Sequence, residues 1–265
     1  MKKSDKISGM RDLSNQNVLH IRTDEVDYLR FPVFDQYGVV AINAIRGRQS
    51  LDYVGDGDEP FRAICAAVGA DVNKIVRIHK QLHSDICVRV NAPDQEIPDC
   101  DALMTNVPGI ILVTREADCV PVLIYDPVQK VVANVHSGWR GTVKHIVRAA
   151  IVKMREEYGS NPQDLICALL PAIGADHFFV RDDVRLPFER EFGDAHIQPQ
   201  GDGYLLDMVS CVQDDLLAAG VRADNIKDSG ICTVCEMDQV NSSRGGANSM
   251  RNAAMIFIKE ETHEE

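Results

Sequence analysis

The sequence is poor in basic side chains and has no long apolar run. Its 28 lysines and arginines face 40 aspartates and glutamates, giving a net charge of −12 at pH 7. An acidic surface repels the phosphates of nucleic acids and anionic membranes, so we expect neither as a partner. No stretch approaches the ~20 consecutive apolar residues of a transmembrane helix. The sequence therefore predicts a globular protein, and it leaves the oligomeric state open.

Cysteines are also sparse, with 8 in 265 residues. This density is far below that of small disulfide-bonded scaffolds, so the cysteines are expected to be core thiols, metal ligands or nucleophiles. The first 20 residues carry basic side chains without the apolar stretch of a secretory signal. We therefore expect a cytoplasmic location.

The chain contains no repeat, low-complexity tract or linker that would divide it. We expect a flexible N-terminus over residues 1–15, one catalytic domain over residues 16–259 and an acidic tail over residues 260–265.

Short β-rich runs alternate irregularly with two amphipathic segments. The apolar period predicts helices over Thr142–Tyr158, stopped by Gly159, and over Met208–Ala219, capped by Asp207. Several β-rich runs are continuously apolar, which is typical of strands buried on both faces. The predicted strands are Gly38–Ile45, Lys74–Ile78, Ile110–Thr114, Val120–Tyr125, Val131–Val135, Leu165–Leu170 and Ala253–Ile258. This order favours an α+β fold, a single domain of mixed β-sheets flanked by helices.

Two of these strands flank the turn Asp126–Gln129, in which proline stands at the second position. If this turn closes a hairpin, Tyr125 pairs with Lys130, and the same register sets Cys119 opposite His136. Their Cβ atoms would then lie roughly 5 Å apart, close enough to share a metal ion. A loop one residue longer or shorter would instead place them on opposite faces, and Cys119 would be a small core residue.

A third ligand is expected because a catalytic zinc keeps three protein ligands and one open position. His83, just after a predicted strand, is the candidate that joins Cys119 and His136. Asp118 directly precedes Cys119, and Asp85 follows His83 by two positions, so either is a candidate to orient a histidine or to act as general base.

A glycine-flanked turn follows His136 and leads into the helix predicted from Thr142. Free backbone N–H groups at Gly138 and Gly141 would favour an anion such as phosphate, and Arg140 could add a charge-assisted hydrogen bond. Trp139, the only tryptophan, either fills the core or stacks on a planar ligand.

The segments Ala117–Val122 and His136–Gly141 together resemble the signature of the laccase-domain family. Members of this family have been described as multicopper polyphenol oxidases, peptidoglycan editing factors and purine nucleoside phosphorylases. Supporting matches are Gln81–Ser84, Asp101–Leu103, Pro171–Gly174, Cys232–Cys235, Ser242–Arg244 and Arg251–Ala254. The resemblance spans residues 38–258.

The resemblance implies a zinc ion held by His83, Cys119 and His136, in a mixed α/β fold. It also implies phosphorolysis of adenosine and related purine nucleosides to free base and ribose 1-phosphate, with adenosine deamination in the same pocket. One cysteine and two histidines do not make a multicopper cluster, so zinc is expected rather than copper.

For phosphorolysis, phosphate would lie against Gly138, Trp139, Arg140 and Gly141. Arg244 and Arg251 are the other basic candidates for phosphate binding, and Asp118 is the candidate acid that helps the purine leave.

The chain departs from the family pattern near its C-terminus. Val240-Asn241 stand where the family carries two aromatics, and Gly245-Gly246 replace an arginine and an acid. If the aromatics wall the nucleoside pocket, we expect weak purine nucleoside binding or a different small substrate.

Two other functions remain open. Cys119 activated by His136 would suit a thiol hydrolase or amidase that needs no metal. Alternatively, a structural zinc would hold the hairpin in a protein that acts through a partner. The Cys232–Cys235 pair shows no sequence partner for a metal or redox site, so both residues are interpreted as buried thiols.

Overall fold

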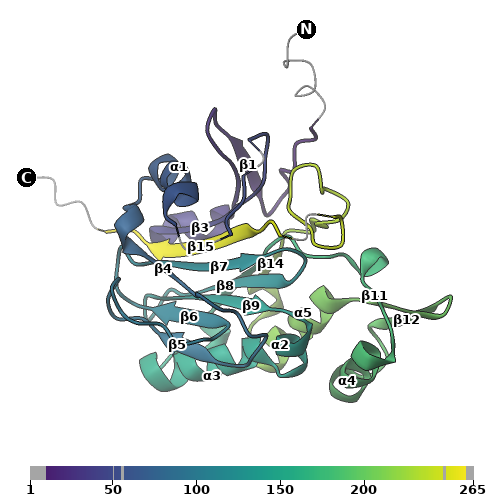
Figure 1. Cartoon of the computed structure of the whole chain (residues 1–265). Helices are drawn as coiled ribbons and strands as arrows, with labels where there is room; N and C mark the ends of the chain where they lie inside the picture. Colours follow the sequence, from purple (N-terminus) through teal and green to yellow (C-terminus); the bar gives the residue numbers. More distant parts are fainter. Residues whose placement is uncertain (1–9, 50, 55–56, 247–248, 261–265) are drawn as a thin grey trace, which may run out of the picture.

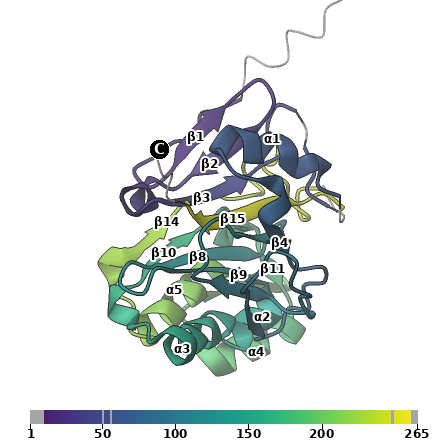
Figure 2. The ribbon, with the colours of Figure 1, turned by 90° about the vertical axis from the view of Figure 1, so that its left-hand side faces the viewer.

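Two six-stranded sheets lie face to face, with α1 over one and α3 and α5 over the other (Figure 1, Figure 2). The computed structural model describes residues 10–49, 51–54, 57–246 and 249–260. This mixed arrangement confirms the predicted α+β class.

The first sheet is antiparallel except where β4 joins β7. Its outer face is covered by α1 (Glu59–Val68), which buries Phe61 and Ile64. The strand order is β1 (Leu19–Arg22), β2 (Asp27–Arg30), β3 (Val39–Ala44), β15 (Asn252–Ile258), β7 (Ile111–Glu116) and β4 (Ile75–Arg77).

The second sheet is parallel at both edges and antiparallel in its centre. Its order is β14 (Ile226–Asp228), β10 (Ile166–Leu169), β8 (Val120–Asp126), β9 (Val131–Ser137), β6 (Ala102–Thr105) and β5 (Cys87–Arg89). Its outer face carries the helices α2 (Trp139–Val143), α3 (Ile146–Tyr158) and α5 (Met208–Ala218).

A small third sheet lies beside α4 at one side of the molecule (Figure 1). It consists of β11 (Phe179–Val180), β13 (Gly203–Leu206) and β12 (Ile197–Gln200), and α4 spans Asp182–Phe192.

The central strands are buried on both faces, as their apolar runs predict. Along β8, Leu123 and Tyr125 pack between the two sheets. Val122 and Ile124 point the other way, into the core beneath the helices. Since alternate residues of one strand serve two cores, neither face tolerates a polar residue without a partner.

All seven predicted strands are present, with no end shifted by more than two residues. The cap of α5 is also confirmed, because the Asp207 side chain accepts a hydrogen bond from the Ser210 N–H. The single helix predicted over Thr142–Tyr158 is wrong. His145 has a left-handed φ of 59°, which separates α2 from α3, and its ring bonds to Asp215 on α5 at 2.9 Å.

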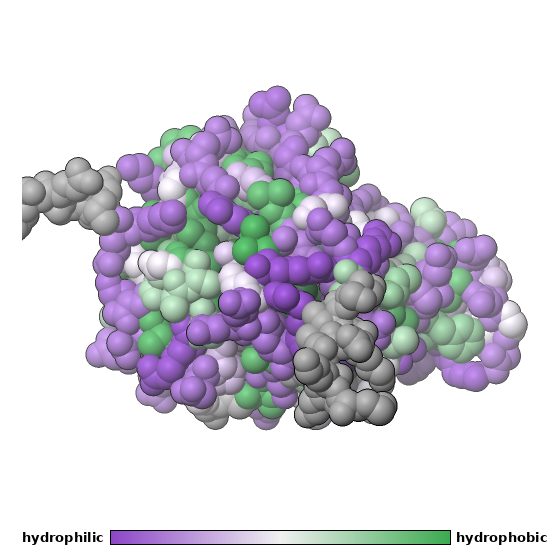
Figure 3. All heavy atoms as spheres, turned by 90° about the horizontal axis from the view of Figure 1, so that it is seen from above, coloured by the Kyte–Doolittle hydropathy of each residue, from purple (hydrophilic) through white to green (hydrophobic). Residues whose placement is uncertain are grey.

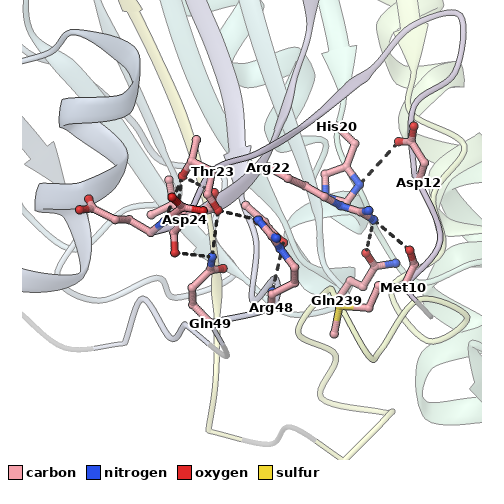
Figure 4. Close-up of polar contacts among 12 residues, drawn as sticks. Met10, Asp12, His20, Arg22, Thr23, Asp24, Arg48, Gln49 and Gln239 are labelled. Atoms are coloured by element: carbon pink, nitrogen blue, oxygen red, sulfur yellow. Dashed lines mark hydrogen bonds and ion pairs between the residues drawn. The ribbon is translucent and has the colours of Figure 1, made fainter. Parts of the chain in front are cut away.

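The described start of the chain is tied to the C-terminal loop (Figure 4). Arg22 donates hydrogen bonds to the carbonyls of Met10 and Arg11 and to the Gln239 side chain. Leu13 is buried nearby. Of the flexible N-terminus predicted over residues 1–15, residues 1–9 lie outside the described residues, as do residues 261–265 of the predicted acidic tail.

Seen from above, the surface is mostly hydrophilic with smaller hydrophobic areas between (Figure 3). Within the described part of the chain, every helix is too short or too polar to cross a bilayer.

Candidate metal centre

The three predicted metal ligands meet at one end of the second sheet. His136 lies near the end of β9, Cys119 directly precedes β8, and His83 lies in the loop between β4 and β5. The Cys119 Sγ atom and one ring nitrogen from each histidine lie within 4.8 Å of one another. Cys119 Sγ is 3.8 Å from His83 Nε2.

The hairpin register that led to this site is wrong by two residues. His136 pairs with Pro121 rather than with Cys119. The Asp126 side chain accepts two backbone N–H bonds inside the turn, and Lys130 adopts a left-handed φ of 53°, so the loop spans residues 127–130. Because side chains alternate with a period of two, this shift leaves Cys119 on the His136 side of the hairpin.

Asp101, which the sequence offered only as part of the family resemblance, orients the His136 ring and holds the backbone of the His83 loop. It is fully buried at the edge of β6, and its Oδ1 accepts from His136 Nδ1 at 2.9 Å. The same carboxylate accepts from the backbone N–H groups of Leu82, His83 and Ser84. The bond to His136 leaves Nε2 of that ring available to a metal. Asp85 is exposed and does not take this role.

Gly138 and Gly141 have a packing role that the sequence interpretation missed. A Cβ on Gly138 would lie 1.9 Å from His83 Cδ2, and one on Gly141 would lie 3.1 Å from the Ser84 carbonyl oxygen. His83 itself has a positive φ of 56°. Small residues here let the strained His83 loop approach the end of β9.

The electrostatics of the site favour a thiolate ligand. Burial opposes ionisation of Cys119, but His136 and His83 outweigh it and lower the pKa of the thiol to about 6. Burial likewise disfavours the charged form of His136, yet Cys119 and Asp101 raise its pKa to about 10.

The donor set and its spacing fit zinc. Zn–S and Zn–N bonds of about 2.3 and 2.0–2.1 Å place tetrahedral sulfur and nitrogen ligands roughly 3.6 Å apart. The separation of 3.8 Å between Cys119 and His83 is close to that value. Three such ligands leave a fourth position open.

Asp118 is a positioning residue in this structure. One carboxylate oxygen accepts from the Thr233 and Ser242 hydroxyls, both at 2.6 Å, and the other accepts from the Arg244 N–H at 2.8 Å. With a positive φ of 88°, Asp118 also turns the chain into Cys119. Its hydrogen bonds fix this turn and occupy the carboxylate that was predicted to act as an acid.

A cleft of about 390 Å³ opens over the three ligands, within the range of roughly 300–1,000 Å³ for small-molecule sites. Of the predicted substrate residues, Arg251 lines it. Arg115, which was not predicted, lines it as well. The wall comprises Val54, Gln81, His83, Arg115, Glu116, Ala117, Cys119, His136, Ser243, Ser249 and Arg251.

The other predicted phosphate-binding residues lie outside this lining. Trp139 packs against the core beneath the helices, and the Arg140 guanidinium stacks 4.1 Å from the centre of its ring. Arg244 donates to the carbonyl of Phe179. The helix α2 has only five residues. The His83 ring packs against Gly138, at the start of this helix, where the predicted phosphate would have to lie.

Glu116 is the functional candidate that the sequence did not reveal. It ends β7 of the first sheet, and its Oε1 accepts from Asn43 Nδ2 at 2.7 Å. Its Oε2 is buried and has no hydrogen-bond partner within the described residues. Burial raises the pKa of Glu116 to about 8, so the carboxyl is protonated at neutral pH.

Val240 and Asn241 do not wall the cleft, so the expected loss of aromatic stacking has no basis in this structure. Both are fully buried: Val240 packs between the two sheets, and Asn241 donates to the carbonyls of Leu51 and Arg251.

The fold and the site together define an α+β protein whose cleft holds two histidines and one cysteine, a candidate metal centre. The chain belongs to the family described as multi-copper polyphenol oxidoreductase laccase, whose model matches residues 47–259.

Relatives of this chain carry the names of nucleoside-processing enzymes. A purine nucleoside phosphorylase of Bacteroides thetaiotaomicron is 34% identical over 163 residues, 60% of each chain. The match therefore spans less than two thirds of that relative. An adenosine deaminase, RL5, from an unknown prokaryotic organism is 33% identical over 82% of this chain and 89% of its own.

Solved structures of similar fold are also known. The hypothetical protein YfiH of Bacillus licheniformis superposes with a TM-score of 0.82 and 26% identity, covering 92% of this chain and 100% of its own. YlmD of Geobacillus stearothermophilus has a TM-score of 0.81 and 25% identity, with 94% and 100% covered.

Proposed function

We propose that this protein is a zinc-dependent purine nucleoside phosphorylase. It would convert adenosine or a related nucleoside and phosphate into free base and ribose 1-phosphate. The observation that carries the proposal is a single cleft that combines three metal donors, a buried protonated carboxyl and two arginines. The names of the relatives support the same substrate class.

His83, Cys119 and His136 would hold the zinc ion, and Asp101 would keep His136 oriented toward it. When bound, zinc supplies a Lewis acid that polarises substrate oxygen and lowers the pKa of bound water. Because Cys119 and both histidines line the cleft, a zinc ion held by them would act on a substrate bound there.

Glu116 is the residue we assign to proton donation. In phosphorolysis a phosphate oxygen forms a bond to the ribose C1′ while the bond from C1′ to the purine nitrogen breaks and leaves its electron pair on the base. That base needs a proton. A carboxyl with a pKa near 8 still carries one at neutral pH and is acidic enough to give it up.

Arg115 and Arg251 are the residues we assign to phosphate. Both line the cleft, and Arg115 is fixed by bonds from its guanidinium to the carbonyls of Ile78 and His79. Charge-assisted hydrogen bonds from arginine would neutralise phosphate as it attacks.

The test is to incubate the zinc-loaded protein with adenosine, with and without phosphate, and to separate the products. We expect adenine and ribose 1-phosphate only with phosphate. Arg251→Ala should raise the KM for phosphate at least tenfold, whereas Arg140→Ala should leave it unchanged because Arg140 stacks on Trp139. Absence of adenine would reject phosphorolysis, and inosine formed without phosphate would assign deamination instead.

One observation favours a second candidate. The lowered pKa of Cys119 also suits a thiol nucleophile paired with His136. A metal-free preparation separates the two functions: the hydrolase keeps its turnover and is alkylated at Cys119, whereas the zinc enzyme loses turnover.

A further inference from the structure

A second cluster of soft ligands lies outside the cleft. One donor atom each of His177, Cys232 and Cys235 can be placed within 4.8 Å of the others, and His177 Nε2 is 3.1 Å from Cys235 Sγ. None of the three lines the cleft over His83, Cys119 and His136. The sequence interpretation of Cys232 and Cys235 as buried thiols is wrong, because Cys235 is exposed and Cys232 is half-buried.

Backbone bonds hold the two segments of this cluster in place. Ala172 and Cys232 form a parallel bridge, flanked by hydrogen bonds from Ala172 N–H to Ile231 and from Thr233 N–H to Ala172. The N–H of Gly174 donates to Cys232 Sγ at 3.2 Å, and a Cβ on this glycine would lie 3.2 Å from the same sulfur. The short helix Ala175–His177 then brings the imidazole back over the thiols.

We propose that His177, Cys232 and Cys235 bind a second zinc ion. Two thiolates and one imidazole form a soft donor set typical of zinc. The cysteines are separated by two residues, the usual spacing of a zinc-binding pair, and the third ligand comes from a segment 55 residues earlier. On binding, the two thiols release their protons to solvent, and water completes the fourth position.

This ion would stabilise the turn at Asp118, which leads into the ligand Cys119 of the first centre. Thr233, which lies between the two cysteines, donates its hydroxyl to Asp118 at 2.6 Å. Ile173, on the His177 segment, donates its N–H to the Asp118 carbonyl at 3.0 Å. Both segments that the ion joins therefore hold the residue that sets the turn before Cys119.

The second site should be the weaker of the two. Both sites offer three protein ligands, but His177 and Cys235 are exposed, whereas His83 and Cys119 are half-buried and His136 is buried. A chelator titration is therefore expected to release this equivalent of zinc before the equivalent held by the buried centre.

The test is the zinc content of the full chain, purified under reducing conditions without chelator. We expect Cys235→Ser and His177→Ala each to lose one equivalent relative to the natural sequence, and the control His196→Ala to lose none. Cobalt substitution gives a second readout: the thiolate-to-cobalt absorption should fall by about two thirds in Cys232→Ser/Cys235→Ser, which removes two of three thiolate ligands.

His177 is exposed, so its replacement keeps the test valid if a cysteine variant does not fold. Unchanged zinc content in His177→Ala and Cys235→Ser would overturn the proposal. A Cys232–Cys235 disulfide in the freshly purified protein, found by mass spectrometry, would also overturn it. Because these variants leave Cys119 and His136 intact, failure here is distinct from failure of the proposed catalytic zinc.

Discussion

At the residue scale, three carboxyl groups near the site have different roles because their hydrogen-bond partners differ. Asp101 accepts bonds from both histidine segments, and these bonds outweigh the effect of burial and lower its pKa. Both oxygens of Asp118 also accept hydrogen bonds, and these bonds fix the turn before Cys119. Glu116 keeps one buried oxygen without a partner among the described residues. Of the three, only Glu116 lines the cleft and retains a proton to transfer.

This assignment predicts a distinct pH dependence. The pKa of Glu116 in the fold is about 8, against an ordinary value of 4.5, so the proton-donating form is present below pH 8 and is lost above it. Phosphorolysis should therefore decline as the pH rises through about 8. Glu116→Gln should lower kcat by roughly 10²–10⁴-fold and remove that decline, since the amide carries no transferable proton.

The matched control is Glu96→Gln, at an exposed position between β5 and β6. Its pH profile should follow that of the natural sequence. The assignment fails if Glu116→Gln retains the same decline near pH 8 with undiminished kcat.

The raised pKa of Glu116 also makes the free energy of unfolding fall as the pH rises. The fold binds this proton more tightly than the unfolded chain, so its stabilising contribution is complete below pH 4.5 and is lost as the pH rises toward 8. Urea unfolding of Glu116→Gln should show a weaker loss of stability over that interval.

At the element scale, continuous apolar runs identified the central strands because both faces of β8, β9 and β15 are buried. Edge strands such as β1 and β12 escaped prediction because they are short and largely exposed. The helix α4 contains Pro187, which normally ends a helix. The apolar period runs on through His145, so the break between α2 and α3 left no local signal.

Close packing between elements yields a further prediction. Gly138 has an ordinary φ of −76°, so replacing it adds no backbone strain. The new Cβ in Gly138→Ala would collide with the His83 ring. We expect a loss of about 1–3 kcal/mol in unfolding free energy, typical of overpacking, and weaker zinc retention.

Gly57→Ala is the control, because a Cβ there would meet nothing within 4 Å. Chemical unfolding and zinc analysis of both variants check the prediction. If Gly138→Ala matches Gly57→Ala in stability and zinc content, then the glycine is not required for the approach of His83.

At the scale of the whole molecule, the cleft forms where the ends of two sheets meet. The sequence predicted His83, Cys119 and His136 because a hairpin and a ligand count could select them. It could not predict that β7 of the first sheet would bring Glu116 to these ligands, because that contact depends on how the sheets stack. The distances that place Asp101 and Arg115 at the site are likewise properties of the assembled fold.

The most direct test of the account is the zinc content of Cys119→Ala/His136→Ala beside the natural sequence, measured on samples that are also assayed for adenine release. We expect the double variant to lose one equivalent of zinc and all phosphate-dependent adenine formation while keeping its folded circular dichroism spectrum. Equal zinc content in the two proteins, or undiminished adenine release by the variant, would contradict a catalytic zinc at His83, Cys119 and His136.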